Sequence, residues 1–208
     1  MDIEYKGANS VVISTKKTVV VVDPKLSRVG LKDVVVKDAV QLTTTDEERV
    51  VVDQRLAING PGEYEVGDIS VRGIAASRHF DDNDAKKATM YTVNTGDVKI
   101  AIVGHVKANL TDEQLEELGI IDILVVPVGG GGYTLDATEA TALTRKISPK
   151  VVIPTHYADA AISYEVPQAE LDLFVKEIGA AHESVPKFKV KGGALPEVLT
   201  VIEITRTS

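Results

Sequence analysis

Short apolar runs that end at glycine or proline dominate this sequence and restrict what it can fold into. The run 18–22 ends at Asp23-Pro24, the run 98–103 ends at Gly104, the run 121–128 enters four successive glycines, and the run 150–153 stops at Pro154. Apolar runs of this length, rich in valine and bounded by turn residues, are typical of strands buried on both faces. The sequence therefore predicts a buried β-sheet, with the residues that do chemistry in the loops at its strand ends.

Helical patterns follow in the second half of the chain. They are predicted at 111–118, where Thr111 begins a capping box, at 136–147, and at 167–178, which begins with proline and ends before Gly179. Strands that alternate with helices after a strand-rich first half indicate the α/β class. No linker or low-complexity tract divides the chain, so we expect a single domain over residues 1–208.

Composition excludes several classes of function. The 208 residues carry a formal net charge of −8, which disfavours a nucleic-acid partner. The chain has no cysteine, so a disulfide, a thiolate zinc site and a cysteine nucleophile are excluded. The sequence contains neither a signal-like segment nor an apolar run long enough to span a membrane, so we expect a cytoplasmic protein without a membrane partner. The acidic run at 80–84 lacks the spacing of a calcium loop and is predicted to be a solvated loop. Formation of a homo-oligomer stays open.

Three of the four histidines come shortly after strand-like runs. His79, His105 and His156 each follow such a run within a few residues. If those strands share one sheet, their ends bring the three imidazoles together, and neutral imidazole is the commonest metal ligand in proteins. Spacing alone leaves a second interpretation open, in which the three are unrelated polar loop residues.

Longer segments of the sequence resemble the metallo-β-lactamase fold superfamily. The resemblance is carried by Val22-Asp23-Pro24, by residues 122–130 and by the stretch 149–157, which ends in Pro154-Thr155-His156-Tyr157. Within that superfamily the chain is similar to the branch of L-ascorbate-6-phosphate lactonase and related zinc-dependent hydrolases. The resemblance implies a four-layer αββα sandwich with a metal site along one edge.

The main metal-binding signature of that superfamily, H-x-H-x-D-H, is degenerate in this sequence. Thr44, Asp46, Glu48 and Arg49 stand where the resemblance places two histidines, the aspartate and the last histidine of the signature. The next family histidine falls near Arg78, the bridging aspartate aligns with His105, and only His156 is retained. Arginine has no acceptor and does not deprotonate, so it cannot ligate a metal. The usual two-metal centre is therefore not expected.

The resemblance and these departures leave three hypotheses. In the first, the chain is a divergent hydrolase of a small anionic substrate, a lactone or a phosphoester. One divalent metal, with zinc preferred, is held by His79, His105 and His156 with Asp46 or Glu48, while Arg49 and Arg78 hold the negative group of the substrate. In the second, Arg49, Arg78 and the histidines form a metal-free pocket for an anion. In the third, the site is inactive and the protein is an interaction scaffold. The sequence leaves open whether the protein is an enzyme. Of the three hypotheses, we take the divergent hydrolase as the prediction.

Overall fold

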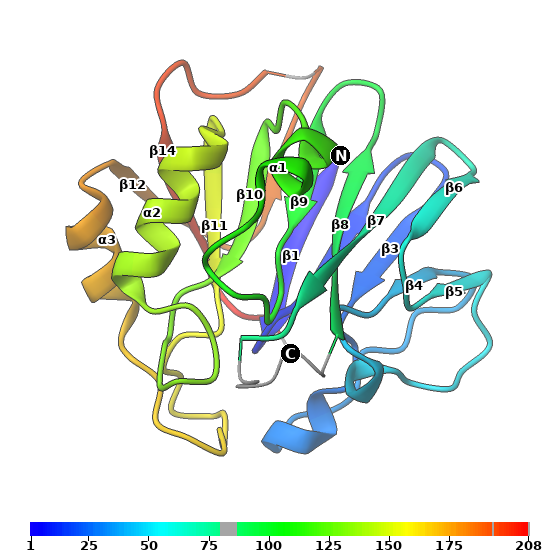
Figure 1. Cartoon of the computed structure of the whole chain (residues 1–208). Helices are drawn as coiled ribbons and strands as arrows, with labels where there is room; N and C mark the ends of the chain where they lie inside the picture. The colour runs from blue at the N-terminus through cyan, green and yellow to red at the C-terminus, as the bar shows by residue number, and fades with distance from the viewer. Residues whose placement is uncertain (80–86, 193, 208) are drawn as a thin grey trace.

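Two β-sheets packed face to face form the centre of the molecule (Figure 1). The computed structural model describes residues 1–79, 87–192 and 194–207, and the acidic run at 80–84 lies outside them. The first sheet has the strand order β13-β1-β2-β3-β4-β5, and the second has the order β12-β14-β11-β10-β9-β8-β7-β6. The strands are β1 (Asp2–Gly7), β2 (Ser10–Ser14), β3 (Val19–Val22), β4 (Val40–Leu42), β5 (Leu56–Ile58), β6 (Gly62–Val66), β7 (Ile69–Ser77), β8 (Lys87–Asn94), β9 (Lys99–Ile102), β10 (Ile123–Pro127), β11 (Val151–Thr155), β12 (Ala181–Val185), β13 (Phe188–Lys189) and β14 (Thr200–Ile204).

The central strands of the second sheet are buried on both faces, as their continuous apolar runs predict. In β10, Ile123 and Val125 pack into the core between the two sheets. Leu124 and Val126 point the other way, into a second core beneath the helices. Successive side chains of a strand lie on opposite faces, so a run without polar residues can supply two cores at once.

Three α-helices, α1 (Asp112–Leu118), α2 (Ala137–Ile147) and α3 (Leu171–Ile178), cover the outer face of the second sheet (Figure 1). Both α1 and α2 begin with a capping box, built by Thr111 with Gln114 and by Asp136 with Glu139. In such a box each side chain satisfies a main-chain N–H that the first helical turn leaves without a partner. These two helix starts are confirmed.

The outer face of the first sheet has a thinner cover. Val12 and Val21 pack there against Ala39, Val34 and Val36, which belong to a stretch without regular secondary structure after the 3₁₀ helix η1 (Leu26–Val29). Two sheets between outer layers confirm the predicted α/β sandwich. None of the helices in the described ranges combines the length and apolar character needed to span a membrane.

Two local predictions are wrong. The three successive valines Val50–Val52 predict a further, weaker strand, but they do not form one. The side-chain amide of Gln41 binds both the N–H and the carbonyl of Val50 in place of a neighbouring strand. The third helix begins at Leu171 rather than at Pro167. The residues between Pro167 and Leu171 lie in a loop, in which Ala169 N donates a 2.7 Å hydrogen bond to the carbonyl of Gly129.

Candidate functional site

A small cavity lies at the edge of the sandwich where several strands end. Strands β9, β10 and β11 are parallel, so their carboxyl ends meet at the same edge of the second sheet. Figure 1 shows the loops after β10 and β11 near η1 at the lower side of the view. The volume of the cavity is about 30 Å³, enough for roughly two water molecules. Its uncharged polar lining comes from Asn9, His105, Tyr133, His156, Tyr164 and Gln168.

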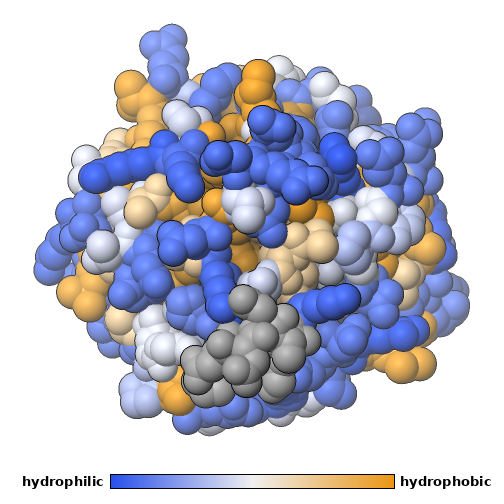
Figure 2. Space-filling model, in the orientation of Figure 1, coloured by the Kyte–Doolittle hydropathy of each residue, from blue (hydrophilic) through white to orange (hydrophobic). Residues whose placement is uncertain are grey.

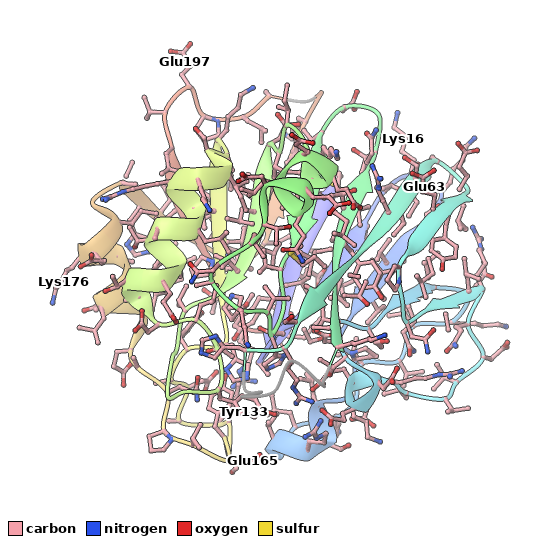
Figure 3. The ribbon with its side chains drawn as sticks, in the orientation of Figure 1. Lys16, Glu63, Tyr133, Glu165, Lys176 and Glu197 are labelled. Atoms are coloured by element: carbon pink, nitrogen blue, oxygen red, sulfur yellow. The ribbon has the colours of Figure 1, made fainter. Side chains whose placement is uncertain are left out.

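Charged side chains surround the same cavity. Lys25, Arg28, Glu48 and Glu165 contribute to its wall. Figure 3 shows Glu165 and Tyr133 at the lower edge of the molecule, while Lys16, Glu63 and Glu197 lie at the opposite side. The visible face in Figure 2 is largely hydrophilic, with apolar surface in separate areas.

Two buried, neutral imidazoles form one wall of the cavity. The ring centroids of His105 and His156 lie 5.1 Å apart in an edge-to-face arrangement, and each residue is 3% exposed. Burial lowers the pKa of His156 to about 4. Burial, with His156 and Arg78 nearby, holds the pKa of His105 well below its usual range. Both rings are therefore uncharged at neutral pH.

Each imidazole is oriented by a side-chain amide. Asn9 Nδ2 lies 3.0 Å from His105 Nδ1, and Asn9 Oδ1 accepts a hydrogen bond of 3.1 Å from the Thr155 hydroxyl. On the other ring, His156 Nδ1 lies 3.1 Å from Gln168 Oε1, and Gln168 Nε2 donates to the carbonyl of Val166. Hydrogen bonds with these two amides therefore hold the wall formed by His105 and His156 in place.

Arg28 lies at the centre of the charged rim. Its guanidinium is 3.4 Å from Glu48, 3.7 Å from Glu47 and 3.8 Å from Glu165, measured between the nearest nitrogen and carboxylate oxygen in each case. Its side chain is 31% exposed, so it faces both the cavity and the solvent. Hydrogen bonds between two charged groups usually span about 2.7–2.9 Å, so none of these three contacts saturates the guanidinium.

Two carboxyl groups beneath the rim resist ionisation. Burial raises the pKa of Asp23 to about 7, against the lowering effect of 2.7 Å hydrogen bonds from the N–H and hydroxyl of Thr44. Burial and the nearby Asp23 carboxyl raise the pKa of Glu48 to about 8, although Arg28 opposes this shift. The Asp23 and Glu48 carboxyl groups are therefore partly protonated near neutral pH, which reduces the negative charge around the cavity.

Backbone strain is concentrated at this edge. Ala8, Asp23 and His156 adopt left-handed φ values of 46°, 44° and 53°, and they are three of the five non-glycine residues in the described ranges that do so. His156 N donates a 2.8 Å hydrogen bond to the carbonyl of Ala8. Such a conformation is expected to cost on the order of 1 kcal/mol or more per residue, and it is found preferentially at functional sites. The strain supports this edge as the functional one.

The structure brings some of the predicted site residues together. His105, His156 and Glu48 line the same cavity. Arg78 is buried and forms a 2.6 Å ion pair with Glu47, the same carboxylate that lies 3.7 Å from Arg28.

The other predicted residues do not line the cavity. Asp46 and Arg49 are exposed. The main-chain N–H of His79 donates to the carbonyl of His105 at 2.8 Å, but its ring lies elsewhere, with Nε2 4.0 Å from Glu139. His79 Nδ1 is buried without a hydrogen-bond partner among the described residues.

Sequence reasoning missed Asn9, Lys25, Arg28 and Gln168. Lys25 and Arg28 directly follow the strand that ends at Asp23-Pro24, so their position after a buried strand was the available signal. Asn9 lies in the turn of the first hairpin, between β1 and β2, where no motif pointed to it. Gln168 had no such signal, because it was assigned to a helix.

The residues present do not fit the metal centre that the resemblance implies. Within residues 1–79, 87–192 and 194–207, no group of three His, Asp or Glu side chains is placed to hold a metal ion. One ring nitrogen of His105 accepts from Asn9, which leaves the proton on the other, so this neutral imidazole offers no free lone pair. The pKa of Glu48 is raised to about 8, so this carboxyl largely keeps its proton at neutral pH and is then a poor metal ligand.

Comparison with known proteins identifies the family. A family model described as "Beta-lactamase superfamily domain" matches residues 2–156, so the chain belongs to that superfamily. A curated relative from Natranaerobius thermophilus, described as a UPF0173 metal-dependent hydrolase, is 29% identical over 111 residues, which are 53% of this chain and 48% of the relative. The chain thus spans about half the length of that relative.

Solved structures support the same fold. A Thermotoga maritima protein, described as a candidate zinc-dependent hydrolase of the metallo-β-lactamase superfamily, has a TM-score of 0.78 at 22% identity, with 98% of this chain and 100% of that chain covered. The metallo hydrolase Igni18 from Ignicoccus hospitalis has a TM-score of 0.64 at 15% identity, with 86% and 90% covered. At these identities the similarity establishes the fold and not the activity.

Proposed function

We propose that the cavity binds the anionic group of a small molecule, a phosphate or a phosphate ester, and that Arg28 makes the main contact. The observation that carries the proposal is the placement of one unsaturated, partly exposed guanidinium at the mouth of a polar cavity. A planar guanidinium presents five N–H donors and matches the oxygens of carboxylate and phosphate groups.

Two further features favour an anion in this place. Lys25 adds a second positive charge to the wall, and its nearest carboxylate, Asp33, is 3.6 Å away. The raised pKa of Glu48, about 8, leaves that carboxyl largely uncharged at pH 7, so it competes weakly for Arg28. An incoming anion can then replace the long contacts of Arg28 with short, charge-assisted hydrogen bonds.

The test compares two arginine variants by titration calorimetry with inorganic phosphate. We expect Arg28→Ala to weaken phosphate binding at least tenfold, which corresponds to about 1.4 kcal/mol. Arg55→Ala is the matched control, because Arg55 is exposed and pairs with Asp38 away from the cavity. Equal binding by the wild type and both variants, or no binding by the wild type, would refute the proposal.

Metal-dependent hydrolysis of a lactone or phosphoester is the second candidate. Membership of the superfamily and the description of the curated relative favour it. It predicts stoichiometric zinc or another divalent metal in the purified protein, lost in both His105→Ala and His156→Ala. It also predicts phosphodiesterase or lactonase activity that a chelator abolishes. A folded protein without metal and without such activity would leave anion binding as the function of the cavity.

A further inference from the structure

We infer that Asn9 and Gln168 are positioning residues that hold His105 and His156 in opposite neutral tautomers. The cavity would then select an oxyanion that still carries a proton, such as hydrogen phosphate or the monoanion of a phosphate monoester. The inference rests on the proposed anion-binding function and adds a rule for which anions bind. Its support is the contact of Asn9 with His105 and of Gln168 with His156, and not the charged residues around the cavity.

The tautomer of His105 follows from Asn9. Thr155 donates its hydroxyl proton to Asn9 Oδ1, which leaves Nδ2 as the atom that faces the ring. An amide nitrogen only donates, and it lies 3.0 Å from His105 Nδ1 but 3.4 Å from Nε2, so the shorter contact assigns the acceptor role to Nδ1. A neutral imidazole that accepts at Nδ1 carries its proton on Nε2. His105 is therefore a hydrogen-bond donor.

The tautomer of His156 follows from Gln168 in the same way. The Gln168 amide donates through Nε2 to the carbonyl of Val166 at 3.0 Å, so its oxygen faces the ring. An amide oxygen only accepts, so His156 Nδ1, at 3.1 Å, must carry the proton. The lone pair of this imidazole is then on Nε2. His156 is therefore a hydrogen-bond acceptor.

His105 and His156 both line the cavity. Because Nδ1 of each ring faces its amide, the inferred arrangement leaves Nε2 of His105 as a donor and Nε2 of His156 as an acceptor for a molecule in the cavity. An anion that binds Arg28 must also satisfy the lone pair of His156, because a buried acceptor without a donor is unfavourable. Hydrogen phosphate has a proton to donate near neutral pH, whereas sulfate has none. The lone pair of His156 repels a sulfate oxygen, which carries no proton. We therefore expect sulfate to bind less well than hydrogen phosphate, although the two dianions have the same charge and nearly the same shape.

The binding test uses inorganic phosphate and sulfate with the folded wild-type chain at pH 6.5 and constant ionic strength. Every inorganic phosphate ion keeps at least one proton at this pH. We expect phosphate to bind at least about tenfold more tightly than sulfate. Equal affinity for the two anions overturns the tautomer inference but leaves the anion-binding function standing. Absence of binding by both overturns the proposed function and the inference together.

The variant Gln168→Glu tests the role of the amide. A carboxylate at this position favours a positively charged His156, whose Nε2 then donates and accepts sulfate. We expect the ratio of phosphate to sulfate affinity to fall toward one in this variant. Gln54→Glu adds the same charge outside the cavity lining and should keep the wild-type ratio. An unchanged ratio in Gln168→Glu overturns the inference.

A spectroscopic readout does not depend on any ligand. Long-range ¹H–¹⁵N correlation spectra distinguish the two imidazole tautomers, and the chain has only four histidines to assign. We expect the Nδ1–H form for His156 and the Nε2–H form for His105 in the unliganded wild type. The same tautomer on both rings contradicts the inference, even if a variant fails to fold.

Discussion

Replacement of Gly129 by alanine is expected to displace His156 and Gln168, two residues that line the cavity. Gly129 follows β10. A Cβ atom there would overlap the main-chain oxygen of His156 and would lie 2.5 Å from Oε1 and 3.1 Å from Cβ of Gln168. The His156 backbone has little room to retreat, because its N–H is bonded to the carbonyl of Ala8 and its φ is already left-handed.

The magnitude follows from this crowding. Overpacking of a well-packed site costs about 1–3 kcal/mol, mainly as displaced backbone and side chains. For a chain of this length, each kcal/mol lowers the melting temperature by about 2–4 °C. We therefore expect Gly129→Ala to melt roughly 2–12 °C below the wild type. Its phosphate affinity should also fall, because Gln168 and His156 are the groups that must move.

Thermal and denaturant unfolding, monitored by circular dichroism, provide the measurement. Gly60→Ala is the control, because a Cβ at Gly60 would have no atom within 4 Å and its φ is not left-handed. Where the backbone conformation suits alanine, the exchange is expected to be neutral or to stabilise by up to about 1 kcal/mol. Equal stability of the Gly129→Ala and Gly60→Ala variants would show that the predicted contact does not exist.

Two further predictions concern the surroundings of the cavity. Tyr91 donates its buried hydroxyl to the carbonyl of Thr43 at 2.9 Å, so Tyr91→Phe should lose about 1–2 kcal/mol of unfolding free energy in urea titrations; an unchanged midpoint would contradict this. The carboxyl pKa values of Glu48 and Asp23 are raised in the folded state, so the fold binds more protons than the unfolded chain and its stability falls as pH rises toward about 8. His156, with its pKa lowered to about 4, opposes this trend only below about pH 6.5. Between pH 6.5 and 8 we therefore expect a decline of up to about 1.4 kcal/mol per pH unit for each proton involved, and a flatter profile for Glu48→Gln; equal slopes for the two proteins would refute the assignment.

The strands and helices were largely predictable because their signals are local. The capping boxes at Thr111 and Asp136 and the two-sided burial of β10 each depend on residues close together in the sequence. The strand predicted at Val50–Val52 failed, because a side chain nine residues away, Gln41, binds the backbone of Val50. Local β-propensity cannot register such a competitor.

The site was less predictable than the fold. His105 and His156 were identified from their positions after strands, and the structure places them in one cavity. Arg28 was not singled out, and the arginines that were singled out, Arg49 and Arg78, do not line the cavity. Alignment with a family motif locates a residue along the chain, but it does not tell which way a loop side chain points.

The sequence by itself determined the class of fold, the superfamily resemblance and the loss of the usual metal ligands, because residue identity and short-range periodicity decide these properties. Only the tertiary structure decided which groups meet at the sheet edge. Asn9 contacts a ring 96 residues further along the chain and a hydroxyl 146 residues further along. Hydrogen-bond direction and proton position depend on such contacts between distant segments, so they arise only when the two sheets have packed.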